Sequence, residues 1–532
     1  MVKTYAALAA FGVCGSILLG ARGVHSPAVD GQLVNVESHR SLVSLSDDMV
    51  DHSRDCTHDE PPTNLFLADS VWPMTHRNPY NQASSSAPGP RDAFHASPQF
   101  LSGEAVPITL AVSGPYPNGQ RVIWGNTLKH VFKIDAGGKR FEYLSRRPRS
   151  QVRDRAISGA YSLVDREGTF FVPRGAKIEA YADAERNRPA SAIAKIGHFS
   201  VPTELLDSPD EMIVGLNMTY DGRLVFVTQL GLVGTLSRQL DDFVYLRLGS
   251  KTEEISNSVA VDETGGIFVV TNHTMNRVQW TPDGMPRIQV AWRVPYQSCE
   301  RRCLGRLGTG SGTTPSLVGV GEQNKFVVIC DGQPLMHMVL YWRDAIPEDW
   351  PGLPGLDRRV AADVPVTFGD DQAVNSTTEQ SLTVRGHDVG VVSNRYGELS
   401  PWFRQFAESV AGADAHLATI YRSNHAELAP HGVEKFRWDS FDRQLTSQWA
   451  NRSASCPNGI PTMSAATGLF YFIGQRDARW TLEALDWETG RSRFHRSLSR
   501  GVRHNSFYAA TEIGPGGTIL TGTYGGVLRF GK

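Results

Sequence analysis

The chain has 532 residues, of which 40% are hydrophobic and 20% charged, and its formal net charge at pH 7 is −2. Charges of both signs are interspersed, so nothing in the sequence builds the positive field that nucleic acid or an anionic membrane surface requires. These properties exclude those two partners and favour a small molecule or another protein.

The first residues have the pattern of a secretory signal peptide. Lys3 gives a positive start, residues 6–19 form an apolar core, and residues 21–23 offer small side chains for cleavage. The apolar run is too short to span a membrane comfortably, and no later stretch approaches that length. We therefore expect a signal peptide over residues 1–23 and a soluble protein that is secreted through the secretory pathway.

Residues 24–119 are rich in Ser, Pro, Asp and His and show little periodicity. Such a segment favours an extended arm over an independent domain. We expect this arm to wrap over the remaining domain, residues 120–532, with Trp72, Phe94 and Phe100 as its anchors.

The remaining domain repeats one pattern, in which a short alternating run, a turn and an apolar run form a β-hairpin. Spacings of roughly forty to eighty residues are typical of propeller blades with variable loops. We predict an all-β fold, a single β-propeller of seven blades, or of six if the hairpins at 381–393 and 463–473 form one distorted blade. The seven hairpins span 161–172, 216–228, 257–271, 315–330, 380–393, 461–473 and 505–522.

Outer strands and the closure of the disc also have sequence signals. Six runs that follow the hairpins alternate, and five of them end on an aromatic residue, which is typical of a half-exposed third strand. The C-terminal hairpin is expected to supply three strands of the last blade, and an N-terminal strand near 121–143 the fourth. Residues 401–410 predict a helical insert. The six runs are 177–181, 232–236, 277–280, 337–342, 433–438 and 482–487.

The starts of the inner strands predict a polar patch. In a propeller these starts converge on the central channel, and a Ser or Thr recurs there. Before it stand Asn257, Gln380 and Asn505, with Glu379 and His504 one step earlier. Amides, a carboxylate and an imidazole at one channel mouth are typical of a small-molecule site. The alternative is that the repeated hydroxyl only bonds backbone.

Loops after the inner hairpins add further candidates. His273 and Asp331 follow apolar runs, and Arg301 lies in a basic loop that could clamp an anionic or phenolate ligand. Tyr508 and Tyr524 belong to the closing blade and would add hydroxyl donors near the same mouth. The alternative for these residues is a solvated loop position or a packing role.

The cysteines predict one small disulfide ring. Cys299 and Cys303 bracket the basic loop, and an oxidising compartment would link them. Cys56 and Cys456 are the next pair that we consider, whereas Cys330 lies within an apolar run and is expected to be a buried free thiol.

Four glycosylation sequons fit a secreted protein. They begin at Asn217, Asn272, Asn375 and Asn451. Asn375 and Asn451 lie in polar loops, whereas Asn217 falls in a stretch that also reads as a strand.

The hairpin at 257–271 resembles the repeats of calcium lactonases and strictosidine-synthase-like propellers. That resemblance implies a calcium ion held by an Asn that precedes such a strand. Asn257 matches this position and Asn505 is similar, while Glu379 and Asp331 are the candidates for the remaining ligands. A calcium-dependent lactonase or esterase is therefore one interpretation.

As a whole, the signal peptide, length, arm, sequons and irregular propeller resemble the hetero-Diels–Alderases of fungal tropolonic sesquiterpene biosynthesis. The resemblance implies cofactor-free coupling of a tropolone quinone methide to a macrocyclic, humulene-type terpene, both hydrophobic small molecules. Preorganisation alone contributes roughly 7–11 kcal/mol to such a reaction.

On this interpretation Glu379 or His504 would assist dehydration to the diene. Gln380 and the other amides would orient its oxygens. A third interpretation, a non-catalytic propeller that binds a protein or glycan on its rim, stays open.

Overall fold

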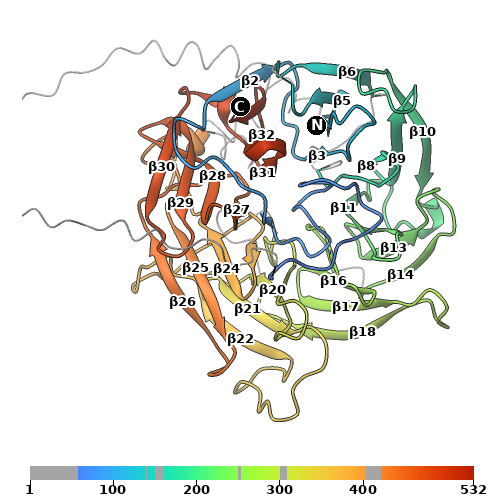
Figure 1. Cartoon of the computed structure of the whole chain (residues 1–532). Coiled ribbons are helices and arrows are strands. Elements are labelled where there is room, and N and C mark those ends of the chain that lie inside the picture. The colour runs from blue at the N-terminus through green and yellow to red at the C-terminus, as the bar shows by residue number, and fades with distance from the viewer. Residues whose placement is uncertain are drawn as a thin grey trace, which may run out of the picture. The chain divides into compact units, whose positions relative to one another are not determined.

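Eight sheets follow one another along the described part of the chain and stand as blades around a common centre (Figure 1). Each has four antiparallel strands, and one of them has a short fifth strand that pairs parallel. The computed structural model describes residues 58–138, 140–149, 160–249, 253–299, 308–402 and 421–531. All the strands belong to one compact unit, made of Cys56–Glu398 and Thr419–Lys532.

The first four blades contain strands β3 to β18, with the innermost strand first. Their bounds are β3 Leu110–Val112, β4 Val122–Asn126, β5 His130–Asp135 and β6 Tyr143–Pro148 in blade 1; β7 Leu163–Val164, β8 Phe170–Arg174, β9 Lys177–Asp183 and β10 Ile193–Ser200 in blade 2; β11 Ile213–Met218, β12 Leu224–Thr228, β13 Leu232–Leu236 and β14 Val244–Arg247 in blade 3; β15 Ala260–Val261, β16 Gly266–Val270, β17 Thr274–Trp280 and β18 Ile288–Pro295 in blade 4.

The last four blades contain strands β19 to β33, and two strands from the N-terminal side join them. Their bounds are β19 Ser316–Val318, β20 Phe326–Cys330, β21 His337–Trp342 and β22 Val360–Pro365 in blade 5; β23 Thr383–Arg385, β24 Asp388–Val392, β25 Val433–Asp439 and β26 Gln444–Asn451 in blade 6; β27 Thr462–Ser464, β28 Leu469–Arg476, β29 Arg479–Asp486 and β30 Ser492–Ser497 in blade 7, with β1 Ser84–Ser85; β31 Thr511–Gly514, β32 Thr518–Thr523, β33 Gly526–Phe530 and β2 Pro98–Ser102 in blade 8.

Burial along a strand follows its place in the blade. Second strands such as β16 and β20 are buried at every residue, because neighbouring blades cover both of their faces. Fourth strands such as β18 and β26 alternate between exposed and covered residues, because they form the outer rim. All six predicted third strands, including the run at 337–342, occupy the third position of a blade.

The predicted number of blades is wrong, and so is the alternative of six. Residues 110–148 form a complete first blade, although the sequence assigned 121–143 to closure. The hairpins at 381–393 and 463–473 belong to separate blades, 6 and 7. The hairpin was missed although Thr109 precedes β3 much as Thr462 precedes Met463, because residues 113–121 form a long turn between β3 and β4.

The disc closes with a strand from the N-terminal side, as expected, but not with the expected strand. β2 pairs antiparallel with β33, from Pro98 opposite Phe530 to Ser102 opposite Gly526. The C-terminal hairpin supplies the other three strands, β31 to β33. Strands β1 to β3 all lie within the residues that the sequence assigned to an arm.

A second N-terminal segment fills the channel. Each innermost strand pairs on one side only, so its other edge faces the centre with free N–H groups. Residues 72–86, which we call the channel strap, run along these edges and accept those groups with their carbonyl oxygens; they belong to the deep-blue segment at the middle of the disc (Figure 1). The N···O distances are 2.7–3.1 Å, and the donors are Val112, Val164, Val261, Leu317, Val384, Met463 and Ala465.

Side chains fasten the strap further. The Asn81 amide donates to the carbonyls of Val259 and Pro315, in blades 4 and 5. Ser316 and Thr462, two of the repeated hydroxyls, donate to the carbonyls of Asn81 and Ala83. For these two residues the backbone-bonding alternative is confirmed, and the backbone in question is the strap.

Helical structure is sparse. The described residues contain three 3₁₀ turns, at Thr203–Leu205, Val502–His504 and Pro515–Gly517. None of their helices is long and apolar enough to cross a membrane. The predicted signal peptide and residues 403–410 of the predicted helical insert lie outside the described residues.

Candidate functional site

The strap carries a histidine to the centre of the disc. His76 has a φ of +57°, and its carbonyl accepts the N–H groups of Asn78 and Ala83, so the strap curls tightly here. This curl turns the imidazole toward blade 6, where Nε2 lies 3.1 Å from Oγ of Ser381. The imidazole is 1% exposed.

Residues from non-adjacent blades meet around this imidazole. The Tyr161 ring of blade 2 lies 5.9 Å from it, measured between ring centroids. The Tyr161 hydroxyl continues to Oγ1 of Thr314 in blade 5, at 3.3 Å. Because blade 2 is not a neighbour of blades 5 and 6, these contacts cross the channel. We call His76, Tyr161, Thr314 and Ser381, together with Gln380 next to Ser381 in the chain, the axial site.

The axial site is uncharged at neutral pH. Burial lowers the pKa of His76 to about 4, so its imidazole is neutral. Burial likewise raises the pKa of Tyr161, so its hydroxyl stays protonated. The site therefore offers neutral donors and acceptors of hydrogen bonds.

Several buried polar atoms of the axial site have no hydrogen-bond partner among the described residues. They are both amide atoms of Gln380 and Nδ1 of His76, and Oγ1 of Thr377 nearby in the chain is in the same condition. Leaving a buried donor or acceptor unpaired costs about 1–3 kcal/mol, so such atoms in a native protein call for water or a ligand. Gln380, with both of its amide atoms in this state, is therefore the residue of the axial site that most strongly indicates a bound ligand.

Two other predicted residues border the Gly-rich loop at 308–315. Asn257 donates its amide to the carbonyl of Ser311, at 2.9 Å. Glu379 is half-buried, and a Cβ on Gly312 would lie only 3.0 Å from its carboxyl carbon. The structure thus brings Asn257 and Glu379 to one loop, with Gln380 next to Glu379 in the chain.

The predicted residues of blade 8 have other surroundings. His504 bonds Oγ of Ser499 at 2.8 Å and packs edge-on against Phe100 of β2, the outermost strand of its blade. Asn505 is buried and donates to Oγ of Ser423. The structure does not bring these two side chains to the axial site.

Tyr508 and Tyr524 lie on either side of Phe507, with centroid distances of 5.1 Å to it. This arrangement agrees with the packing alternative for both tyrosines.

The remaining candidates lie on loops. His273 is exposed, and its Nδ1 lies 3.3 Å from Oγ of Ser298. Asp331 accepts the N–H groups of Gln333 and His337, so it closes its own hairpin, and burial raises its pKa. Arg301 lies outside the described residues.

The expected calcium ligands are not gathered. Among the residues that the structure describes, no three His, Cys, Asp or Glu side chains are grouped to hold a metal ion. The Asp331 carboxylate accepts a backbone N–H group of its own hairpin. The side-chain amides of Asn257 and Asn505 donate their N–H groups to oxygen atoms of the protein.

Cysteine states are partly as expected. Cys299 is disulfide-bonded, and its predicted partner Cys303 lies outside the described residues. Cys330 is a buried free thiol, as predicted. Cys456 is also a buried free thiol, so the considered pair with Cys56 is wrong.

The sequon at Asn217 is not usable in the folded chain. Asn217 is 0% exposed within β11, and its amide donates to the carbonyls of Pro79 and Val259. We expect no glycan there, whereas Asn375 is partly exposed and stays a candidate. Glycopeptide mass spectrometry of protein secreted by a eukaryotic host checks this, and an occupied Asn217 in the folded fraction would contradict it.

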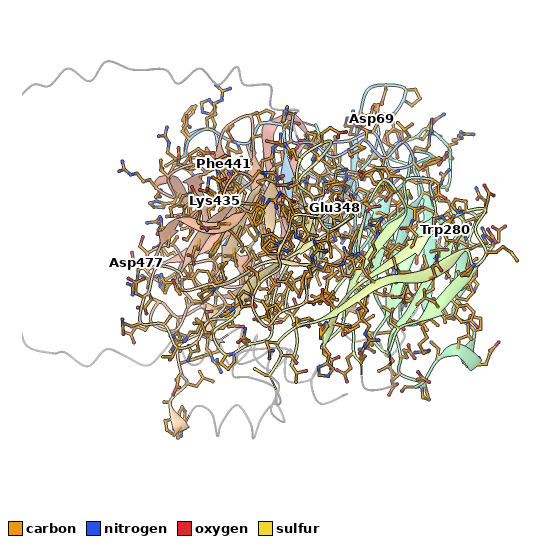
Figure 2. All side chains as sticks on the ribbon, turned by 90° about the horizontal axis from the view of Figure 1, so that it is seen from below. Asp69, Trp280, Glu348, Lys435, Phe441 and Asp477 are labelled. Carbon is orange, nitrogen blue, oxygen red and sulfur yellow. The ribbon has the colours of Figure 1, made fainter. Side chains whose placement is uncertain are left out.

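A separate surface pocket of about 280 Å³ lies between turns of blades 3 and 4. Trp280, which Figure 2 labels, and three arginines are among the residues that line the pocket. Their guanidinium groups already have carboxylate partners, so the pocket has no excess positive charge to attract an anion. These pairs are Arg223 and Arg287 with Asp242, and Arg238 with Asp165 and Glu167.

The fold and the site define an eight-bladed β-propeller whose channel is filled by its own N-terminal segment. The chain belongs to the family of an uncharacterized protein of Archaeoglobus fulgidus, with which it is 45% identical over 478 residues, 88% of this chain and 89% of that protein. No family model matches the chain.

Solved propellers share its fold. A europium-containing methanol dehydrogenase superposes with a TM-score of 0.54 at 11% identity, over 87% of this chain and 97% of that one. A quinohaemoprotein alcohol dehydrogenase of Comamonas testosteroni gives 0.53 at 12% identity, over 86% and 80%. At such identities the likeness bears on the fold alone.

Proposed function

We propose that the protein is an enzyme that acts on a neutral, oxygen-bearing small molecule at the axial site. The observation that carries this proposal is the buried Gln380 amide, whose oxygen and nitrogen both lack a partner among the described residues. A buried amide in that state can donate its N–H groups to an oxygen atom of a ligand and accept a hydrogen bond from a ligand with its oxygen.

The finer proposal is the intermolecular hetero-Diels–Alder cycloaddition that the family resemblance implies. That reaction converts three π bonds into two σ bonds and one new π bond, and it consumes no oxidant, reductant or cofactor. It is accelerated when a donor polarises the carbonyl oxygen of the heterodiene, because charge develops on that oxygen in the transition state. The Gln380 N–H groups would be that donor.

The neutral surroundings support this chemistry. His76 carries no charge at neutral pH, so the amide does not compete with an ion for the substrate oxygen. Tyr161 is the partly exposed member of the axial site and would contact the substrate ring. Glu379 stays the candidate for assisting the dehydration that generates the quinone methide.

Replacing Gln380 by methionine tests the proposal, because it removes the amide at nearly constant volume. We expect the variant to be more stable than the natural protein, since an unpaired buried amide is lost. We also expect the cycloaddition to slow by about 10- to 1000-fold. The assay mixes a hydroxymethyl tropolone with humulene and compares rate and product ratio with the uncatalysed reaction.

Gln82 supplies the matched control. It is fully buried at 0% exposure, against 1% for Gln380, but its amide accepts from Asn78 and donates to the carbonyl of Leu317. Gln82→Met should therefore lower the melting temperature. Unchanged rate and stereoselectivity in Gln380→Met would refute the assignment of Gln380.

A non-catalytic binding propeller is the second candidate, because the strap fills the channel that an enzyme would otherwise use. The same assay separates the two, since a binding protein would leave the natural protein's rate equal to the uncatalysed one. Secretion stays a prediction under either function.

A further inference from the structure

The channel strap touches blades that are remote from it in the chain. Its carbonyls accept N–H groups of blades 1, 2, 4, 5, 6 and 7, and Pro79 accepts the side-chain amide of Asn217 in blade 3. Its only covalent route toward the blades leads through residues 87–97 to β2 of blade 8. Within this route, residues 91–95 form a largely exposed turn, with Phe94 76% exposed.

The backbone of the strap depends on these surroundings. His76, Arg77, Asn81 and Ala83 have φ values between +51° and +75°, in the left-handed region that L-residues other than glycine rarely adopt. Such conformations persist only where the surrounding structure over-determines them. The strap therefore takes its shape from the channel wall, as a bound peptide does.

We propose that the strap is a clasp, a built-in peptide bound by the channel wall that holds the blades together independently of the covalent link to β2. The mode is that of a peptide added to exposed strand edges, with main-chain bonds for affinity and side-chain pockets for register. Here the inner edges of seven blades share one peptide. The clasp lies on the axis, whereas the β2–β33 pairing closes the outside of blade 8.

Cutting the exposed turn tests the clasp. A protease recognition sequence is inserted between Phe94 and His95, in the full chain, within an exposed turn that includes contacts of Asp92 with His95 and Ala96. After cleavage we expect the N-terminal fragment, which contains the strap, to co-elute with the rest of the protein. It should be released only in the same denaturant transition that unfolds the blades.

A weakened strap sharpens the test. Asn81→Gly keeps the left-handed backbone but removes two amide hydrogen bonds to the channel wall. We expect the cleaved variant to lose its fragment about 10- to 100-fold faster. Asn118→Gly is the control, because that amide lies in an exposed turn and bonds only Gln120, and it should change nothing.

Two results would overturn the clasp. One is release of the fragment under native conditions while the remaining blades keep their circular dichroism and melting temperature. The other comes from hydrogen exchange of the unaltered chain, which decides the matter if the insertion variant fails to fold. The peptides that carry Val164, Leu317 and Val384 should exchange as slowly as second strands such as β20, and fast exchange would contradict the clasp.

Discussion

Replacing Arg343 by alanine is expected to lower the free energy of unfolding by about 3–5 kcal/mol. Arg343 is 0% exposed and lies at the junction of blade 4, blade 5 and the strap. Its guanidinium is 3.4 Å from Glu263, 3.8 Å from Asp262 and 5.1 Å from the Tyr80 ring. Removing the side chain would leave the fully buried carboxylate of Asp262 with one guanidinium partner instead of two, because Arg277 still lies 3.4 Å from it. It would also empty the buried volume that the Arg343 side chain fills and take the nearest guanidinium away from Glu263.

Arg188 is the matched control for that measurement. It pairs with Glu185 on the surface, where both side chains are more than half exposed. Solvent screens such a pair, so Arg188→Ala should change the free energy of unfolding by no more than about 1 kcal/mol. Urea unfolding monitored by tryptophan fluorescence compares the two variants. Equal effects would show that the Arg343 cluster does not stabilise the fold.

The outer architecture could be predicted because it depends on local patterns. Hairpins such as 257–271 and third strands such as 337–342 carry strand patterns in their own sequence, and the structure places each of them in a blade. The expected half-exposure of the third strands is wrong, because β21 is buried at five of its six residues and β13 at all five. Blade 1 was missed because residues 113–121 form a long turn between its two inner strands, so that β3 and β4 did not read as one hairpin. The length of the inner strand is not the reason, since β7 and β15, in hairpins that were predicted, have only two residues each.

The channel could not be predicted because its bonds are remote in sequence. The strap binds strands that follow it by about 40 to 380 residues, and it does so through main-chain carbonyls that every residue possesses. No composition or spacing signals such a segment, so residues 72–86 read as part of an arm. His76 was missed for the same reason.

Part of the axial site did have a sequence signal. Tyr161, Ser258, Thr314 and Ser381 each lie three residues before an inner-strand N–H that the strap accepts, so they share one level of the channel. An alignment of the hairpins on the repeated hydroxyl residue treats Ser258, Ser316 and Ser381 as equivalent. Ser258 and Ser381 do lie at this level, whereas Ser316 lies two residues further along its own inner strand. Alignment on the apolar strand residues would have added Tyr161 and Thr314.

The expected loss of stability in acid follows from His76. Its pKa is lowered from 6.5 in the unfolded chain to about 4 in the folded one, because burial disfavours the charged imidazolium. The folded state therefore resists protonation that the unfolded state accepts. This contribution is fully present above pH 6.5 and is lost as the pH falls through about 4. By linkage it corresponds to about 3 kcal/mol.

Replacing His76 by asparagine isolates this contribution from the carboxylates that also titrate in acid. Asparagine tolerates the φ of +57° at this position and does not titrate. Between pH 6.5 and 4 the variant should lose about 3 kcal/mol less than the natural protein, even if it starts from a lower free energy of unfolding. Denaturant unfolding at half-unit pH steps measures both curves. Parallel curves would mean that the imidazole titrates in the folded protein as it does in the unfolded chain. The buried, uncharged axial site, with the chemistry built on it, would then have to be abandoned.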